Sequence, residues 1–390
     1  MIPYGRQDIS EADIQAVLDV LKSDFLTQGP VVPAFEQATA AHCNVKYAVA
    51  VNSATSALHI ACLALGVGEG DIVWTSPITF VASSNCALYC GANVDFVDID
   101  PQTYNMSVES LKLKLEKAEK NGTLPKVVIP VHLAGQSCEM KQIHSLGNKY
   151  GFRIIEDASH AIGGRYLNGP VGNCKFSDIT VFSFHPVKII TTGEGGMAVT
   201  NDMELSIALS RLRSHGIVRH SAEMTHATDG PWYYQQIELG FNYRMTDIQA
   251  ALGLSQMSRL NDFVSKRHEL AKRYNELLTE PWVKTPWQHP DTYSGLHLYI
   301  IRIQQKNKII SHIQMFERLR NHGILVNLHY IPVYRHPYYQ KLGFKVSDFP
   351  VAEAYYSEAI SLPMYTTLTN EQQDTVVSTI NKPIGFQNLF

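Results

Sequence analysis

Residues 178–200 read DITVFSFHPVKIITTGEGGMAVT and contain two short runs of β-branched and aromatic side chains separated by a loop. Such runs are typical of strands, so we predict strands at residues 179–184 and 196–200. Lys188 lies in the loop between them, with valine and isoleucine on either side. Apolar neighbours disfavour the ammonium form of a lysine and make the nucleophilic amine easier to reach. The pattern suggests a Schiff-base lysine, and the alternative is a surface lysine in a glycine-rich hairpin.

The composition is that of a globular protein, with 45% hydrophobic and 18% charged residues in a chain of 390, long enough for two domains. A net charge of −3 without a basic run argues against nucleic-acid binding. The N-terminal segment lacks an apolar core, and polar residues interrupt the most apolar window, residues 48–67, so we expect neither a secretory signal nor a membrane span. The six cysteines are dispersed without a CxxC pair, which predicts reduced thiols, no metal site and a cytoplasmic location.

Between residues 47 and 156 the sequence alternates between strand-like and helical patterns. This alternation predicts an α/β fold with a mostly parallel sheet covered by helices on both faces. In such sheets, ligands bind outside the carboxyl ends of the strands. We expect strands at residues 47–51, 72–75, 94–99, 127–132 and 153–156, and helices that include residues 107–120 and 139–149.

Three of these carboxyl ends carry informative residues. The first strand is followed by NSATSAL, residues 52–58, which fits either a phosphate site at a helix N-terminus or an ordinary Ser/Thr cap. The second is followed by Phe80, whose ring could lie against a flat ligand or belong to the core. The fifth, residues 153–156, is followed by Asp157 in IIEDASH, residues 154–160, and this acid is either functional or a helix cap. The glycines of TTGEGG, residues 191–196, would let the backbone pass close to a flat ligand.

The N-terminal region is expected to begin with a helix near Ser10. Its apolar residues keep helical spacing, which predicts a stripe that faces the core, formed by Ile14, Val17, Leu18 and Leu21. The irregular loop that follows, residues 25–30, is a connector in the simplest interpretation. Residues 217–239 show no clear periodicity and are predicted to form a long active-site or interface loop.

A long helical pattern, residues 248–278, marks a change of composition, and we place a domain boundary near residue 250. The remaining sequence predicts a smaller α+β domain. We expect strands at residues 296–303 and 325–330, and helices at residues 309–322, 351–360 and 370–380.

The run SFHPVKIITTGEGG, residues 183–196, resembles the lysine motif of the DegT/DnrJ/EryC1/StrS family of sugar aminotransferases. The resemblance extends from residue 28 to residue 363, with the motifs in the family's order. It implies a pyridoxal 5'-phosphate (PLP) enzyme of the aspartate-aminotransferase fold (fold type I). A large domain, residues 1–250, would hold a mostly parallel seven-stranded sheet, and residues 251–390 would form the small domain.

The resemblance also implies roles for particular residues. Lys188 would bind the cofactor covalently and carry the proton, and Asp157 would hold the pyridine nitrogen. His160 stands where many members have Gln, near the cofactor hydroxyl. Asn242 would reach the phosphate in the neighbouring subunit, which implies a homodimer with shared sites. The remaining cofactor residues would be the phosphate ligands Ala54, Thr55 and Ser183 and the ring-stacking Phe80.

Within the family, segments such as LRSHGI and GPWYYQQ are most similar to the aminotransferases of pseudaminic acid biosynthesis. The resemblance implies amination of C4 of a UDP-linked 4-keto-6-deoxy-N-acetylhexosamine with L-glutamate as donor, giving UDP-4-amino-4,6-dideoxy-N-acetyl-β-L-altrosamine. Alternatives are another nucleotide-linked keto sugar, a PLP sugar 3-dehydratase, in which His replaces the lysine, or a non-catalytic binding protein. The implied substrate-binding residues are Tyr4, Leu26, Thr27, His329, Tyr330, Ile331 and Pro332.

Overall fold

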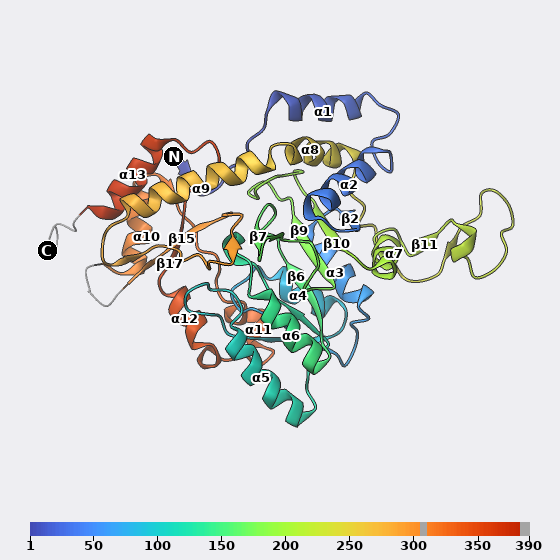
Figure 1. Ribbon diagram of the computed structural model, residues 1–390, viewed down its shortest axis with the longest axis horizontal. Coiled ribbons are helices and arrows are strands. Elements are labelled where there is room, and N and C mark those ends of the chain that lie inside the picture. The colour runs from blue at the N-terminus through green and yellow to red at the C-terminus, as the bar shows by residue number, and fades with distance from the viewer. Residues whose placement is uncertain (305–309, 383–390) are drawn as a thin grey trace.

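The computed structural model describes residues 1–304 and 310–382 and is built around a seven-stranded sheet (Figure 1). The strand order is β2-β10-β9-β6-β5-β3-β4. All neighbouring pairs are parallel except those of β10, which runs antiparallel to both β2 and β9. The mostly parallel sheet predicted from the sequence is therefore confirmed. Its strands are β2 (Tyr47–Val51), β3 (Ile72–Thr75), β4 (Asn93–Phe96), β5 (Val127–Ile129), β6 (Arg153–Asp157), β9 (Ile179–Ser183) and β10 (Gly196–Thr200).

Helices cover both faces of this sheet because successive strand residues point to opposite sides and both sides are apolar. On β3, Val73 packs with the residues of α3 and α4, whereas Trp74 packs with those of α5 and α6 on the other face. A third cluster joins Phe35 of α2 to Phe182 of β9. The helices of this part are α2 (Val31–Cys43), α3 (Ala54–Ala64), α4 (Ala82–Tyr89), α5 (Val108–Asn121), α6 (Met140–Tyr150) and α7 (Met203–Leu212).

A smaller antiparallel sheet has the order β13-β15-β17 and its own apolar core. The first strand of the chain, β1, pairs in parallel with β16 beside this sheet, so the N-terminus is tied to the C-terminal part. The elements are β1 (Ile2–Pro3), β13 (Val283–Lys284), β15 (Tyr299–Ile303), β16 (Ile324–Leu325), β17 (Ala359–Leu362), α9 (Leu260–Leu277), α10 (His312–Asn321), α11 (Pro337–Gln340), α12 (Pro350–Tyr356) and α13 (Asn370–Asn381).

Several expectations for the C-terminal half were wrong in part. The long helical pattern is interrupted at Ser258 and Arg259, giving α8 (Asp247–Met257) and α9. The expected strand at 325–330 ends at Leu325, since β1 offers only a two-residue partner. The expected helix at 351–360 stops at Tyr356, because Ala359–Leu362 joins β15 as β17. The expected helix at 309–322 begins at His312, and residue 309 lies outside the described residues. The domain boundary near residue 250 stays a prediction.

The N-terminal helix α1 (Glu11–Leu21) was expected to bury its apolar stripe, and this was wrong. The side chains of Ile14, Leu18 and Leu21 are 39–51% exposed. The helix is instead held on α8 by the buried Asp13. The carboxylate of Asp13 accepts hydrogen bonds from Ser255 and Gln256 of α8 and forms an ion pair with Arg259. Polar docking thus leaves the apolar stripe of α1 on the surface of the single chain.

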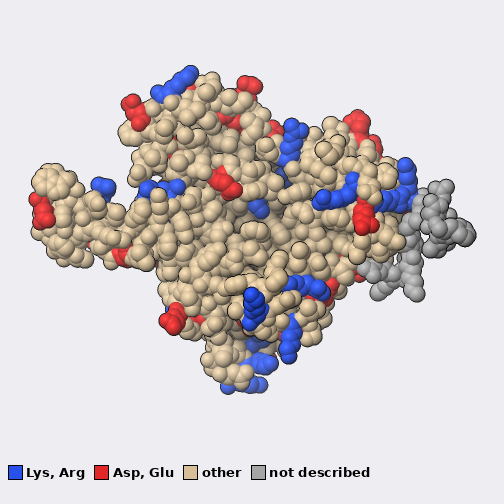
Figure 2. Space-filling model, turned by 180° about the vertical axis from the view of Figure 1, so that it is seen from behind, with Lys and Arg blue, Asp and Glu red and all other residues tan. Residues whose placement is uncertain are grey.

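The remaining elements are short. A hairpin of β11 (Ile217–Val218) and β12 (Gln235–Gln236) carries residues 219–234 away from the body as an arm (Figure 1). A further small sheet contains β7 (Arg165–Tyr166), β8 (Gly169–Pro170) and β14 (Thr292–Tyr293). On the face in Figure 2, basic and acidic side chains lie interspersed in small groups. Within the described ranges, no helix combines the length and apolarity needed to cross a membrane. Single 3₁₀ turns occupy Leu133–Gly135, Ser221–Glu223, Val333–Arg335 and Val346–Asp348.

Candidate active site

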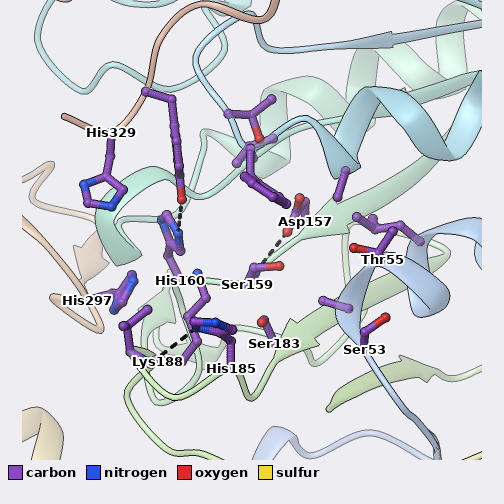
Figure 3. Close-up of a pocket in the computed structure, with 18 of the residues that line it drawn as sticks. Ser53, Thr55, Asp157, Ser159, His160, Ser183, His185, Lys188, His297 and His329 are labelled. Atoms are coloured by element: carbon purple, nitrogen blue, oxygen red, sulfur yellow. Dashed lines mark hydrogen bonds between the residues drawn. The ribbon is translucent and has the colours of Figure 1, made fainter. Parts of the chain in front are cut away.

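A pocket of about 570 Å³ opens at the carboxyl ends of the parallel strands (Figure 3). One wall comes from the turns that follow β2, β3, β6 and β9, and the opposite wall comes from residues near β15 and β16 together with Tyr4. Pairing of β1 with β16 carries Tyr4 into this second wall. Ten of the predicted residues line the pocket, namely Tyr4, Ala54, Thr55, Phe80, Asp157, His160, Ser183, Lys188, His329 and Tyr330.

The turn after β2 presents the N-terminus of α3 to the pocket. Ser53 caps the helix by accepting a hydrogen bond from Ser56 N (3.1 Å). The amides of Ala54 and Thr55 have no acceptor within residues 1–304 and 310–382. A Cβ added to Gly196 would lie 2.5 Å from the amide nitrogen of Ala54, so β10 packs directly beneath this turn. Free amides at a helix N-terminus form a site suited to a phosphate.

Lys188 lies in the tight loop between β9 and β10. Its backbone N–H donates to the carbonyl of His185 (2.9 Å), and Thr192 N–H donates to the carbonyl of Phe184 (3.0 Å), which fixes the loop at both ends. The neighbours Ile189 and Ile190 are buried. Burial lowers the pKa of Lys188 to about 8, and the charge of Asp157 acts in the opposite direction. The lysine is therefore poised between ammonium and free amine near neutral pH, as its apolar neighbours predict.

Asp157 is the last residue of β6 and is buried against the pocket. Its Oδ1 accepts a hydrogen bond from Ser159 N–H (3.1 Å), and its Oδ2 accepts one from the Ser83 hydroxyl (2.6 Å). Residues 158–164, all within the described part of the chain, contain no helix. The helix-cap interpretation therefore fails, and Asp157 is left as a buried carboxylate facing a cavity.

The opposite wall is made of neutral rings, and one of them, Tyr330, meets His160 of the turn after β6. Ala134 N–H donates to His160 Nδ1 (3.2 Å), so His160 carries its proton on Nε2, which lies 3.0 Å from the Tyr330 hydroxyl. Burial lowers the pKa of His329 to about 3. It also lowers the pKa of His160 and of His297 well below the ordinary value, with the charge of Lys188 adding to the effect. These side chains can donate and accept hydrogen bonds without carrying charge.

Phe80 lies at the rim of the pocket and is 59% exposed, so the alternative that it belongs to the core is wrong. Its ring centroid is 6.3 Å from that of Tyr330. A ligand ring that enters the pocket would lie beside it.

The other predicted residues do not line this pocket within the single chain. Asn242 is exposed, and its segment is anchored through main-chain pairing with Ser214. Leu26 and Thr27 are exposed beside the start of α8. Ile331 is also exposed, whereas Pro332 is buried in the segment that Val333 N–H fixes to the carbonyl of Pro77.

Several residues of the pocket were missed by sequence reasoning. Ser53, His185 and Glu194 stand inside the motifs that were quoted, so their positions could have been inferred. Thr79 stands in the turn that carries Phe80. His297, Asn327 and Leu328 have no local signal, because tertiary folding alone brings them to the pocket.

Comparison with known proteins identifies the family. The family model described as "DegT/DnrJ/EryC1/StrS aminotransferase family" matches residues 7–381. The spore coat polysaccharide biosynthesis protein SpsC of Bacillus subtilis is 39% identical, covering 97% of this chain and 96% of its own. The UDP-4-amino-4,6-dideoxy-N-acetyl-beta-L-altrosamine transaminase of Campylobacter jejuni (serotype O:2) is 38% identical, covering 98% of each.

A solved structure of Helicobacter pylori PseC, an aminotransferase involved in the biosynthesis of pseudoaminic acid, superimposes with a TM-score of 0.87. It is 32% identical and covers 97% of this chain and 98% of its own. Together with the half-buried lysine, the carboxylate and the helix N-terminus, these matches show that the chain belongs to the DegT/DnrJ/EryC1/StrS family of PLP-dependent nucleotide-sugar aminotransferases.

Proposed function

We propose that this aminotransferase transfers the amino group of L-glutamate to C4 of a UDP-linked 4-keto-6-deoxy-N-acetylhexosamine. The product would be UDP-4-amino-4,6-dideoxy-N-acetyl-β-L-altrosamine, a precursor in pseudaminic acid biosynthesis, made in the cytoplasm. The observation that carries the proposal is a pocket in which Lys188, with its lowered pKa, and the buried Asp157 share one cavity with a free helix N-terminus. Similarity to the Campylobacter jejuni transaminase supports this choice of substrate.

The side chains of the pocket fit PLP. The amides of Ala54 and Thr55 and the hydroxyl of Ser183 would hold the phosphate. Asp157 would hold the protonated ring nitrogen, and Phe80 would flank the ring. When bound, the cofactor supplies an aldehyde and a ring that withdraws electrons from the reacting carbon.

Lys188 would hold the cofactor between turnovers and would then act as acid and base. Its free amine would take the proton from Cα of glutamate and return it on the cofactor side, and it would move the proton in the reverse direction at C4 of the sugar. A pKa of about 8 lets one side chain perform both steps near neutral pH. The lysine also favours an aminotransferase over the dehydratase, which has histidine at this position.

The neutral wall would hold the sugar. The Tyr330 hydroxyl accepts from His160 and keeps its own proton to donate into the pocket. Tyr4 and His329, whose ring centroids lie 5.2 Å apart, would contact the sugar from the same side. Ile331 and Pro332 would contribute to this wall once the substrate is bound.

We further propose that two copies share their sites. The arm projects from the body, and its Trp232 and the nearby Leu239 are 75% and 79% exposed. The apolar stripe of α1 is also uncovered. Thr27 pairs with Thr246 close to Asn242, so these segments form one exposed region beside α8. In a two-fold dimer this region, with Leu26, would meet the neighbour's pocket, where Asn242 would bind the phosphate.

The test has two stages. Purified protein loaded with PLP is mixed with L-glutamate, and 2-oxoglutarate is measured together with the visible absorbance, with D-glutamate as control. The enzyme that has taken up the amino group from glutamate is then mixed with each member of a panel of UDP- and dTDP-linked 4-keto sugars. A UDP-4-keto-6-deoxy-N-acetylhexosamine aminated in preference to the others supports the proposal. Failure to form 2-oxoglutarate, or preference for a different sugar, would contradict the donor or the acceptor respectively.

A further inference from the structure

Two buried hydroxyl groups lie behind Asp157 and are not explained by the family motifs discussed above. Ser83 is on α4 and Thr79 is in the preceding turn, and both side chains are buried. The Ser83 hydroxyl lies 2.6 Å from Asp157 Oδ2, and the Thr79 hydroxyl lies 2.7 Å from Ser83 Oγ. The three groups form a chain of hydrogen bonds that ends on the carboxylate.

The direction of these hydrogen bonds follows from their chemistry. An ionised carboxylate only accepts, so Ser83 donates to Asp157. Ser83 also lies 3.4 Å from the carbonyl of Phe80, but the short bond to a charged oxygen is the stronger one. The Ser83 hydroxyl has a single proton, which it donates to Asp157, so its oxygen accepts the hydrogen bond from the Thr79 hydroxyl. The order is Thr79 to Ser83 to Asp157.

This chain of hydrogen bonds, together with the amide of Ser159, fixes the plane of the carboxylate. Ser83 holds Oδ2 from the side of α4, and Ser159 N–H holds Oδ1 from the following turn. Each oxygen keeps a lone pair, so the carboxylate can still accept a proton-bearing ring nitrogen. With one donor removed, the side chain could rotate away from that plane.

We propose that Ser83, oriented by Thr79, is a positioning residue that holds the Asp157 carboxylate in the plane where it meets the cofactor's ring nitrogen. The proposal rests on the role proposed above for Asp157. It predicts that Ser83, which does not line the pocket, acts on cofactor binding through Asp157, and that the hydroxyl of Thr79 acts through Ser83.

The experiment measures the dissociation constant of PLP for the cofactor-free protein and the pH titration of the visible band of the bound cofactor. Ser83→Ala should weaken binding by about tenfold, the size expected for a hydrogen bond to a charged group. It should also shift the pH midpoint of the visible band. Thr79→Val should change both quantities in the same direction and by less, whereas Thr79→Ser, which keeps the hydroxyl, should behave as the wild type.

Ser84→Ala is the matched control. Ser84 is the adjacent buried serine of α4, and its hydroxyl bonds Tyr339 (2.7 Å) instead of Asp157. This variant should leave PLP affinity and the titration unchanged. If Ser83→Ala matches Ser84→Ala in both readouts, or if Thr79→Val matches Thr79→Ser, the positioning proposal is wrong.

Asp157→Asn, measured in parallel, separates this proposal from the one on which it rests. If Asp157→Asn alters the visible band and Ser83→Ala does not, Asp157 keeps its role and Ser83 loses its own. If Asp157→Asn changes neither readout, the role of Asp157 itself fails, and the positioning proposal fails with it. Thermal unfolding of each cofactor-free variant shows which ones are folded. If Ser83→Ala does not fold, the comparison of Thr79→Val with Thr79→Ser tests the positioning proposal.

Discussion

The two walls of the pocket differ in the kind of group they present. The wall built on the large sheet carries the amine of Lys188, the carboxylate of Asp157 and the unpaired amides of α3, on loops and a strand end fixed by main-chain hydrogen bonds. The opposite wall presents the rings of His297, His329 and Tyr330, with both histidines kept neutral by burial, which lowers their pKa. Charge is thus confined to the wall where protons would move. The neutral wall suits a sugar, which offers hydroxyl and carbonyl groups.

The largest expected effect comes from removing the amine of Lys188 from the first wall. Lys188→Ala should lower turnover by at least about 10²- to 10⁴-fold through loss of acid–base catalysis alone. The fold should survive, since Lys188 is a loop side chain that does not belong to the apolar core. Lys175→Ala, an exposed lysine before β9, serves as control in a coupled 2-oxoglutarate assay. Near-normal turnover by Lys188→Ala would rule out the assignment.

Asp157→Asn tests the second charge of that wall. The amide keeps the shape of the side chain but cannot stabilise a protonated ring nitrogen by charge. We expect turnover to fall by about a hundredfold, the upper range for a hydrogen bond to a charged group, while PLP still binds. Single-turnover kinetics with glutamate measure this step. Rates equal to those of the parent would mean that Asp157 is purely structural.

The pH dependence of cofactor uptake measures how strongly the first wall perturbs Lys188. Only the free amine reacts, and its pKa is lowered to about 8 from the ordinary 10.5. The rate at which cofactor-free protein combines with PLP should therefore rise about tenfold per pH unit below pH 8 and level off above it. Nα-acetyl-lysine provides the control, because its rate should rise beyond pH 10. A protein rate that also rises to pH 10 would show an unperturbed lysine.

Asn242→Ala asks whether the neighbouring subunit contributes to the first wall. Loss of its amide should weaken PLP retention by about tenfold, in line with one hydrogen bond to a charged phosphate. Mixing this variant with Lys188→Ala should restore part of the activity, because one site of a mixed dimer has both residues intact. Size-exclusion chromatography and subunit exchange with labelled protein are measured first. If subunits exchange and no activity returns, the sites are not shared.

The neutral wall should give the smallest effect. Tyr330→Phe removes one neutral hydroxyl, so KM for the keto sugar should rise by about fivefold, the size of an ordinary hydrogen bond. The value of kcat should change less, since Tyr330 is expected to hold the sugar and not to move its proton. Initial-rate kinetics with glutamate at saturation separate the two constants. A fall in kcat at constant KM would place Tyr330 in the chemical step and would erase the contrast between the walls.

The sequence allowed the first wall to be predicted far better than the second. Strands 47–51 and 72–75 have the predicted bounds, because both faces are buried and turn residues mark the ends. Asp157 ends a strand and Lys188 lies in the loop between two strands, so local pattern places both at the sheet edge. His297 reaches the pocket only through packing of the small domain. The α1 stripe misled the prediction because periodicity shows that a face is apolar, and it does not show what covers that face.

The position of β10 has a consequence for folding. This strand lies between β2 and β9, although about 150 residues separate it from β2 along the chain. The turn that holds Ala54 and the loop that holds Lys188 become neighbours only after β10 has inserted between its two partners. Contacts so distant in sequence form slowly, because the chain must first close a long loop. Recovery of the absorbance band of protein-bound PLP during refolding should therefore follow completion of the sheet, and a partly folded chain should lack that band.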